Sequence, residues 1–170
     1  MPQLLQDIPD GMTCFLDATI FYYHLVNTPP LSDDCLHLLA RIGTGAVAGV
    51  TSAGALAEAT HKVMLAEIVR LHNLPPQGLL AKLKKHPELL DHLTEHQQVT
   101  ALAQALRIQI EPLTPAVLTR GAELSPQRRL LTNDALILAV MEKSGVTYLA
   151  TNDDDFDSIP GLIVCEPARK

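Results

Sequence analysis

The stretch "MTCFLDATIFYYHLV", residues 12–26, joins two different patterns of apolar residues at a single carboxylate. Its first part is a short apolar run that predicts a buried β-strand ending at Asp17. In the second part, Ile20, Tyr23 and His24 recur at the i, i+3, i+4 spacing of a helix face. The stretch therefore predicts a strand that passes directly into a helix, with an acid at the junction.

The same alternation of strand and helix continues along the chain. Further short apolar runs predict strands at residues 46–51, 107–113, 146–151 and 161–166. Helical patterns lie between them, and their expected N-caps are Ser32, Ser52, Thr94, Thr114 and Thr132. We therefore expect an α/β fold of three layers, α/β/α, with a central parallel sheet of about five strands.

Length and charge limit the domain organisation and the classes of partner. With 170 residues, of which 47% are hydrophobic, we expect a single domain over residues 1–170, with a helical elaboration at about 74–106. The formal net charge of −6 argues against a strongly basic nucleic-acid coat. It still permits a local basic strip, and it permits a phosphate substrate that is met by bound metal.

Cysteine usage and hydropathy bear on the cellular compartment. Cys14, Cys35 and Cys165 show no CxxC spacing, so we expect reduced thiols, two of them in core strands. Residues 1–12 lack the basic start and apolar run of a signal peptide, and residues 45–57 are too short to span a bilayer. These features predict a cytoplasmic protein with no membrane contact.

Acidic residues follow the predicted strands. Asp17 ends the first strand, and Asp153 follows the strand at 146–151. Glu58 and Asp134 lie early on helices that come after strands. Because ligands bind beyond the carboxyl ends of the strands in open parallel sheets, these acids can face one crevice and bind a hard divalent cation.

Each acid also has an ordinary structural reading. Asp134 can complement a helix N-terminus, Asp17 can be a turn residue, and Glu58 can be an exposed helix residue. Turn chemistry is a fair explanation for any single acid of the run 153–155. Only the combination of four acids at one end of one sheet favours a site.

Four segments carry a resemblance to a known family. They read "FLDATIFYYHL", "TSAGALAEATHKV", "LLTNDALILAVMEKSG" and "YLATNDDDFDSIPGL". In this order they resemble the signature segments of the PIN domain family, and most closely its VapC-like group of bacterial toxin ribonucleases. The resemblance extends from about Met12 to Val164 and implies the PIN-like form of the three-layer fold.

The resemblance also implies roles for individual residues. The acids expected to bind metal and act in catalysis are Asp17, Glu58, Asp134 and Asp153. Asp155 matches the second acid of the T-N-D-x-D-F segment and is expected to assist the metal, whereas Asp154 and Asp157 are expected to be solvated. Thr151 and Thr19 are expected to support the site, although relatives frequently have Asn at the position of Thr19. Phe156 is expected to anchor this loop in the core.

The expected cofactor is Mg²⁺ or Mn²⁺, because both ions prefer oxygen ligands. Zinc is disfavoured because no Cys/His set has ligand spacing, and His61 fits a helix surface better than a metal site. The resemblance implies hydrolysis of RNA phosphodiester bonds by such a metal-dependent endoribonuclease.

The resemblance further implies an RNA substrate, a small antitoxin partner and a homodimer. Either protein contact could use the apolar surface of residues 22–26, although core packing also explains it. Candidate contacts to RNA phosphates are Lys62, Lys82, Lys84, Lys85, Arg120, Arg128 and Arg129. For the basic run at 82–86 a solvated helix face is the favoured interpretation, and a contact to a phosphate backbone requires that the run flank the cleft.

Other functions compete with the toxin interpretation. The chain can be a catalytically weak PIN-fold binding or scaffold protein, or a non-toxin PIN nuclease of RNA processing. A phosphatase with an aspartyl nucleophile is disfavoured, because Thr19 stands where such enzymes usually have a second Asp. A Rossmann nucleotide-binding protein is disfavoured, because no GxGxxG follows the first strand.

Overall fold

A computed structural model describes residues 3–168 and contains one sheet of six parallel strands in the order β1-β6-β5-β2-β3-β4. The strands are β1 Gln3–Leu4, β2 Thr13–Leu16, β3 Ala48–Ser52, β4 Gln109–Glu111, β5 Tyr148–Ala150 and β6 Ile163–Glu166. The predicted α/β class and parallel sheet are confirmed, but the strand count was one too low. The missed strand, β1, has only two residues and lies at the sheet edge, so no apolar run marks it.

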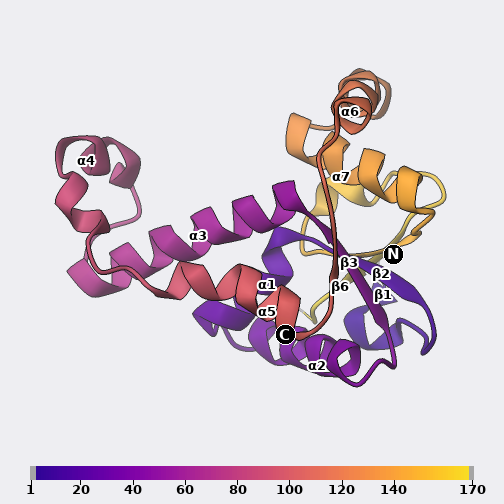
Figure 1. The fold of residues 1–170 in the computed structure, drawn as a ribbon, viewed down its shortest axis with the longest axis horizontal. Coiled ribbons are helices and arrows are strands. Elements are labelled where there is room, and N and C mark those ends of the chain that lie inside the picture. Colours follow the sequence, from indigo (N-terminus) through magenta and orange to yellow (C-terminus); the bar gives the residue numbers. More distant parts are fainter. Residues whose placement is uncertain (1–2, 169–170) are drawn as a thin grey trace.

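Helices cover both faces of the sheet and form three layers (Figure 1). One face carries α1 Ala18–Val26, α2 Leu31–Gly43 and α5 Gln98–Ala105, and the other carries α6 Pro115–Arg128 and α7 Thr132–Ser144. Side chains of β2 alternate between the two cores: Cys14 and Leu16 pack with the first group of helices, and Phe15 packs with the second. The sheet therefore buries both faces, as its apolar runs predicted.

Two of the expected N-caps are confirmed. The Ser52 hydroxyl accepts a hydrogen bond from the N–H of Ala55 at 3.0 Å and starts α3, Ala53–His72. Thr114 starts α6 in the same way. The predicted end of α7 is also confirmed, because Gly145 follows it in the left-handed conformation with φ of 66°.

The other three expected caps were wrong. Helix α2 already begins at Leu31, so Ser32 lies buried inside its first turn. Thr132 is likewise inside α7, which Leu131 precedes as the cap residue. Thr94 directly precedes the turn Glu95–Gln97, but its side chain makes no cap hydrogen bond; the carboxylate of Glu67 accepts from the N–H groups of Thr94 and Glu95.

The elaboration at 74–106 divides between two places. Its last helix, α5, packs in the main core through Val99 and Ala103. The remainder, with α4 Leu79–Lys85, packs around Ile68 near the far end of α3, where Leu79 and Leu93 complete a small separate cluster. Figure 1 shows α4 standing away from the sheet at the end of α3. None of the helices within residues 3–168 combines the length and apolar character of a bilayer span.

Glu67 of α3 binds the backbone of this elaboration through a buried carboxylate. Its side chain is only 3% exposed, and its two oxygens accept hydrogen bonds from the N–H groups of Thr94 at 2.8 Å and Glu95 at 3.0 Å. Burial by itself would raise the pKa of Glu67, but these hydrogen bonds outweigh it and the pKa lies below its ordinary value. The carboxylate thus caps the turn that precedes α5.

All three cysteines are free and buried, as expected for thiols in this core. Cys14 lies in β2 and Cys165 in β6, which confirms two thiols in core strands, while Cys35 lies in α2. Burial raises the pKa of Cys35 to about 12 and that of Cys165 to about 11. These thiols are therefore protonated and unreactive at neutral pH.

Candidate metal and nuclease site

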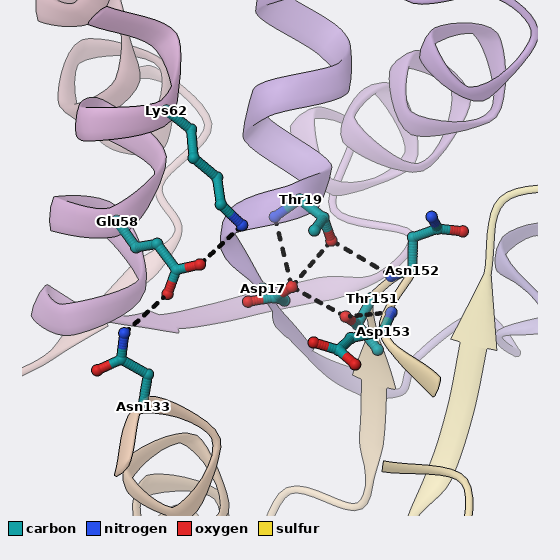
Figure 2. A network of polar contacts seen from close by, with 8 residues as sticks. All are labelled: Asp17, Thr19, Glu58, Lys62, Asn133, Thr151, Asn152 and Asp153. Carbon is teal, nitrogen blue, oxygen red and sulfur yellow. Dashed lines mark hydrogen bonds and ion pairs between the residues drawn. The ribbon is translucent and has the colours of Figure 1, made fainter. Parts of the chain in front are cut away.

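Asp17 stands at the junction of β2 and α1 and is only 6% exposed. One of its oxygens, Oδ2, accepts hydrogen bonds from the hydroxyls of Thr19 and Thr151, each at 2.9 Å. Figure 2 shows both threonines directed at this carboxylate. The hydroxyl of Thr19 thus binds Asp17 directly, and it orients this carboxylate together with Thr151.

Asp153 reaches the same place because β5 lies beside β2, with Leu16 opposite Ala150. Its backbone N–H donates to the Thr151 hydroxyl at 3.1 Å, and its Oδ1 accepts from the N–H of Asp155 at 3.0 Å. The loop that carries these acids is held by Phe156, which is 1% exposed in the core as expected. Asp17 and Asp153 therefore follow the ends of adjacent strands and lie close together (Figure 2).

Glu58 projects from α3 toward the start of α7. Its Oε1 lies 2.7 Å from the Lys62 Nζ, one helical turn further along, and its Oε2 accepts from the Asn133 Nδ2 at 3.3 Å. Both contacts are drawn in Figure 2. Glu58 thereby links α3 to α7 across the mouth of the site.

The acids surround an open cavity of about 500 Å³. Four of the five predicted metal-site acids line it: Glu58, Asp134, Asp153 and Asp155. Leu131, Thr132 and Asn133 complete the lining. Asp17 is not part of this lining, but its charge acts on Asp134. Burial, and then the charges of Asp153, Asp155, Asp17 and Glu58, raise the pKa of Asp134 to about 6. The fold therefore concentrates negative charge at one spot.

The donor chemistry suits a hard cation, because every candidate ligand is a carboxylate oxygen. Within residues 3–168, however, no three His, Cys, Asp or Glu side chains are arranged to hold one metal ion. Glu58 faces Lys62 and Asn133, and Asp17 faces Thr19 and Thr151. The acids gather around the cavity without closing on a common point.

Three residues of the site network had no assigned role in the sequence. Asn133 binds Glu58, as described above, and Asn152 donates its backbone N–H to the Thr19 hydroxyl at 3.3 Å. The side-chain Nδ2 of Asn152 donates to the Tyr23 hydroxyl at 3.0 Å. In the sequence, the one feature that could have indicated a role is that each asparagine directly precedes a predicted site acid, in the strings N-D-A and T-N-D.

The candidate cations are scattered. Lys62 is beside the acids, whereas Arg120 pairs with Glu123 and Glu142 on the surface of α6 and α7. The remaining candidates are exposed on α4 or at the end of α6: Lys82, Lys84, Lys85, Arg128 and Arg129. His61 is exposed on α3, in agreement with a helix-surface residue.

Replacing Asp134 by Asn is expected to stabilise the metal-free protein at neutral pH. The folded pKa of about 6 exceeds the ordinary value of 3.8, so the native state binds more protons between these values and stability falls as pH rises through them. Because the carboxyl is partly exposed, we expect a solvent-screened gain of about 1 kcal/mol, or about 2–4 °C in Tm, at pH 7 in EDTA.

Thermal melts at pH 4 and pH 7 measure this effect, and the difference between variant and wild type should vanish at pH 4. Asp157→Asn is the matched control, because Asp157 is exposed in the loop that carries Asp153 and Asp155 and does not line the cavity. An equal gain at both pH values would contradict the assigned repulsion.

The family model of the PIN domain matches residues 14–162 of this chain. A search of curated protein sequences finds no match. Similar solved structures include a toxin-antitoxin complex from Klebsiella pneumoniae, with a TM-score of 0.54, 18% identity and coverage of 92% of this chain and 99% of that chain.

Two further structures share the fold at low identity. VapBC2 from Rickettsia felis, bound to a DNA fragment of its promoter, has a TM-score of 0.51, 20% identity and coverage of 91% of this chain and 98% of its own. VapC20 of Mycobacterium tuberculosis, a toxin that cleaves the sarcin-ricin loop, has a TM-score of 0.59, 16% identity and coverage of 86% and 95%. The match to the family model covers most of the sequence, and the chain belongs to the PIN domain family.

Proposed function

We propose that this protein is a metal-dependent endoribonuclease that hydrolyses RNA phosphodiester bonds, and that it is the VapC-like toxin of a toxin-antitoxin pair. The observation that carries the proposal is the acid-lined cavity of this PIN domain, together with Asp17 at the end of β2, whose charge acts on Asp134 in the cavity lining. An acidic cavity repels a phosphodiester unless a cation is bound, so nuclease activity there requires a metal.

In this proposal Asp17, Glu58, Asp134 and Asp153 hold Mg²⁺ or Mn²⁺, and Asp155 assists them. A bound divalent ion supplies Lewis acidity and lowers the pKa of water for attack on phosphorus. The chain itself supplies orientation: the hydroxyls of Thr19 and Thr151 fix Asp17, and the Asn133 amide holds Glu58.

Partners are proposed from the relatives. The neighbours from Klebsiella pneumoniae and Rickettsia felis are complexes of toxin with antitoxin, and VapC20 is a toxin that cleaves the sarcin-ricin loop. By analogy we assign an RNA substrate, a small antitoxin and a homodimer to this chain, in the cytoplasm. These three structures share the fold of this chain at 16–20% identity.

A second candidate function is a PIN-fold binding protein with little catalysis. The observation that favours it is the arrangement of acids within residues 3–168, where no three close on a common point. Metal affinity separates the two candidates, because a scaffold protein would bind no Mn²⁺ in calorimetry.

Cleavage of RNA by the purified protein tests the proposed function. Single-stranded RNA, transfer RNA and a sarcin-ricin hairpin should be incubated with Mg²⁺, with Mn²⁺ and with EDTA. We expect endonucleolytic products with either metal and none in EDTA. Intact RNA in all three conditions, together with absent Mn²⁺ binding, would refute the nuclease and leave the scaffold function.

A further inference from the structure

Lys62 introduces a positive charge into the acidic site. It follows Glu58 by one turn of α3, and its Nζ lies 2.7 Å from the Glu58 Oε1. Figure 2 shows the ammonium group pointing into the space between Glu58 and Asp17. Burial lowers the pKa of Lys62, but the hydrogen bond to Glu58 and the charges of Glu58 and Asp17 outweigh this and raise it. Lys62 is therefore a fixed cation of the site at neutral pH.

This pair also accounts for the arrangement of the acids. Among residues 3–168, the Glu58–Lys62 pair is the only ion pair within 4.0 Å made by any of the five site acids. With Oε1 on Lys62 and Oε2 on Asn133, both oxygens of Glu58 are engaged by the protein. Glu58 is thus held away from the other acids, in agreement with the lack of a three-ligand group in the described chain.

Lys62 also borders a second hollow. A groove of about 660 Å³ lies between α1, α3 and α4, and Lys62 lines it together with Thr19, Tyr23 and Leu65. Thr19 belongs at the same time to the hydrogen-bond network around Asp17. Lys62 therefore stands where the groove approaches the acidic site, with a side chain that is 40% exposed.

We infer that Lys62 is a positioning residue with two alternating contacts: it holds Glu58 when no divalent cation is bound, and it contacts an RNA phosphate at the mouth of the groove when the cation takes Glu58. The inference rests on the proposed function. A half-exposed ion pair is weak, so a divalent cation can displace it. The released ammonium remains beside the site, where an incoming phosphodiester needs a counter-charge.

Mn²⁺ binding to the metal-free protein is the first test, measured by calorimetry on wild type, Lys62→Met and Lys62→Gln. Removing the competitor should tighten Mn²⁺ binding about three- to fivefold in both variants, the equilibrium equivalent of one half-exposed ion pair. Lys143→Met is the matched control, because Lys143 forms a similar pair with Glu111 at 2.9 Å, and neither residue lines the cavity. This control should leave the affinity unchanged.

The outcomes separate the inference from the function on which it rests. Absent Mn²⁺ binding by wild type would overturn the metal site itself, and the inference with it. Equal or weaker binding by both Lys62 variants, with normal binding by wild type, would overturn the inference alone. Tighter binding in the control as well would assign the effect to net charge and would also overturn it.

RNA cleavage at saturating Mn²⁺ is the second test. In Lys62→Met and Lys62→Gln, loss of the phosphate contact should raise KM and leave kcat nearly unchanged. The slope of log affinity for RNA against log salt concentration should fall in magnitude by about one. Lys62→Arg retains the charge and should restore KM. A lowered kcat with unchanged KM would show that Lys62 makes no ground-state contact with RNA.

Discussion

Asp17→Asn is expected to lower the kcat of RNA cleavage by roughly 10²- to 10³-fold, the size typical of removing one preorganised electrostatic contact at a reacting centre. The amide oxygen of Asn can still accept the two hydrogen bonds that Thr19 and Thr151 donate to Asp17. The substitution therefore keeps the shape of the site and removes the charge that a divalent cation needs. Single-turnover cleavage of RNA in Mg²⁺ measures the effect.

Asp157→Asn is again the matched control, since it removes the same charge from an exposed position outside the cavity. It should cleave like wild type. Circular dichroism and thermal melts should show that Asp17→Asn remains folded. If Asp17→Asn and Asp134→Asn both cleave at the wild-type rate, the assigned acids are not the active site.

Glu67→Ala is expected to have the largest effect on stability. It removes two hydrogen bonds from backbone N–H groups to a buried carboxylate, those of Thr94 and Glu95, and leaves a cavity under the turn. We expect a loss of about 2–3 kcal/mol, or about 5–10 °C in Tm. Amide hydrogen exchange should localise the loss to residues 74–97, none of which lines the acidic cavity.

The pH dependence of the same variant checks the mechanism. The pKa of Glu67 is lower in the folded protein than its ordinary value of 4.5, so its stabilisation is present above that value and is lost as pH falls through the folded pKa. The difference between wild type and Glu67→Ala should therefore shrink below pH 4.5. Glu95→Gln removes only an exposed ion pair with Arg70 and should cost at most about 1 kcal/mol. A comparable loss in both variants would contradict the role assigned to Glu67.

Local sequence patterns predicted the parts of the site that depend on neighbouring residues in the chain. The apolar run ending at Asp17 became β2, and Ser52 and Thr114 cap their helices as expected. Parallel topology placed Asp17 and Asp153 at the same edge of the sheet, and the pairing of β2 with β5 makes their strands neighbours. These inferences succeed because strand burial and hydroxyl caps involve contacts within a few residues.

Local patterns failed where a distant side chain provides the contact. Thr94 has the spacing of a capping residue, but Glu67, 27 residues earlier, takes its backbone N–H. Asn133 shows no local reason to bind Glu58, from which 75 residues separate it. Secondary-structure propensity cannot predict such partners, because it describes only the preferences of a segment by itself.

The sequence by itself determined the α/β class, the parallel sheet and the set of acids, because alternating apolar runs and carboxylates after strands are local properties. Tertiary structure decided how those acids are used. Packing of α7 against α3 brings Asn133 to Glu58, and one turn of α3 brings Lys62 to the same carboxylate. Charge and hydrogen bonding act through space, so only the folded chain determines that Glu58 faces a lysine while Asp134 faces its fellow acids.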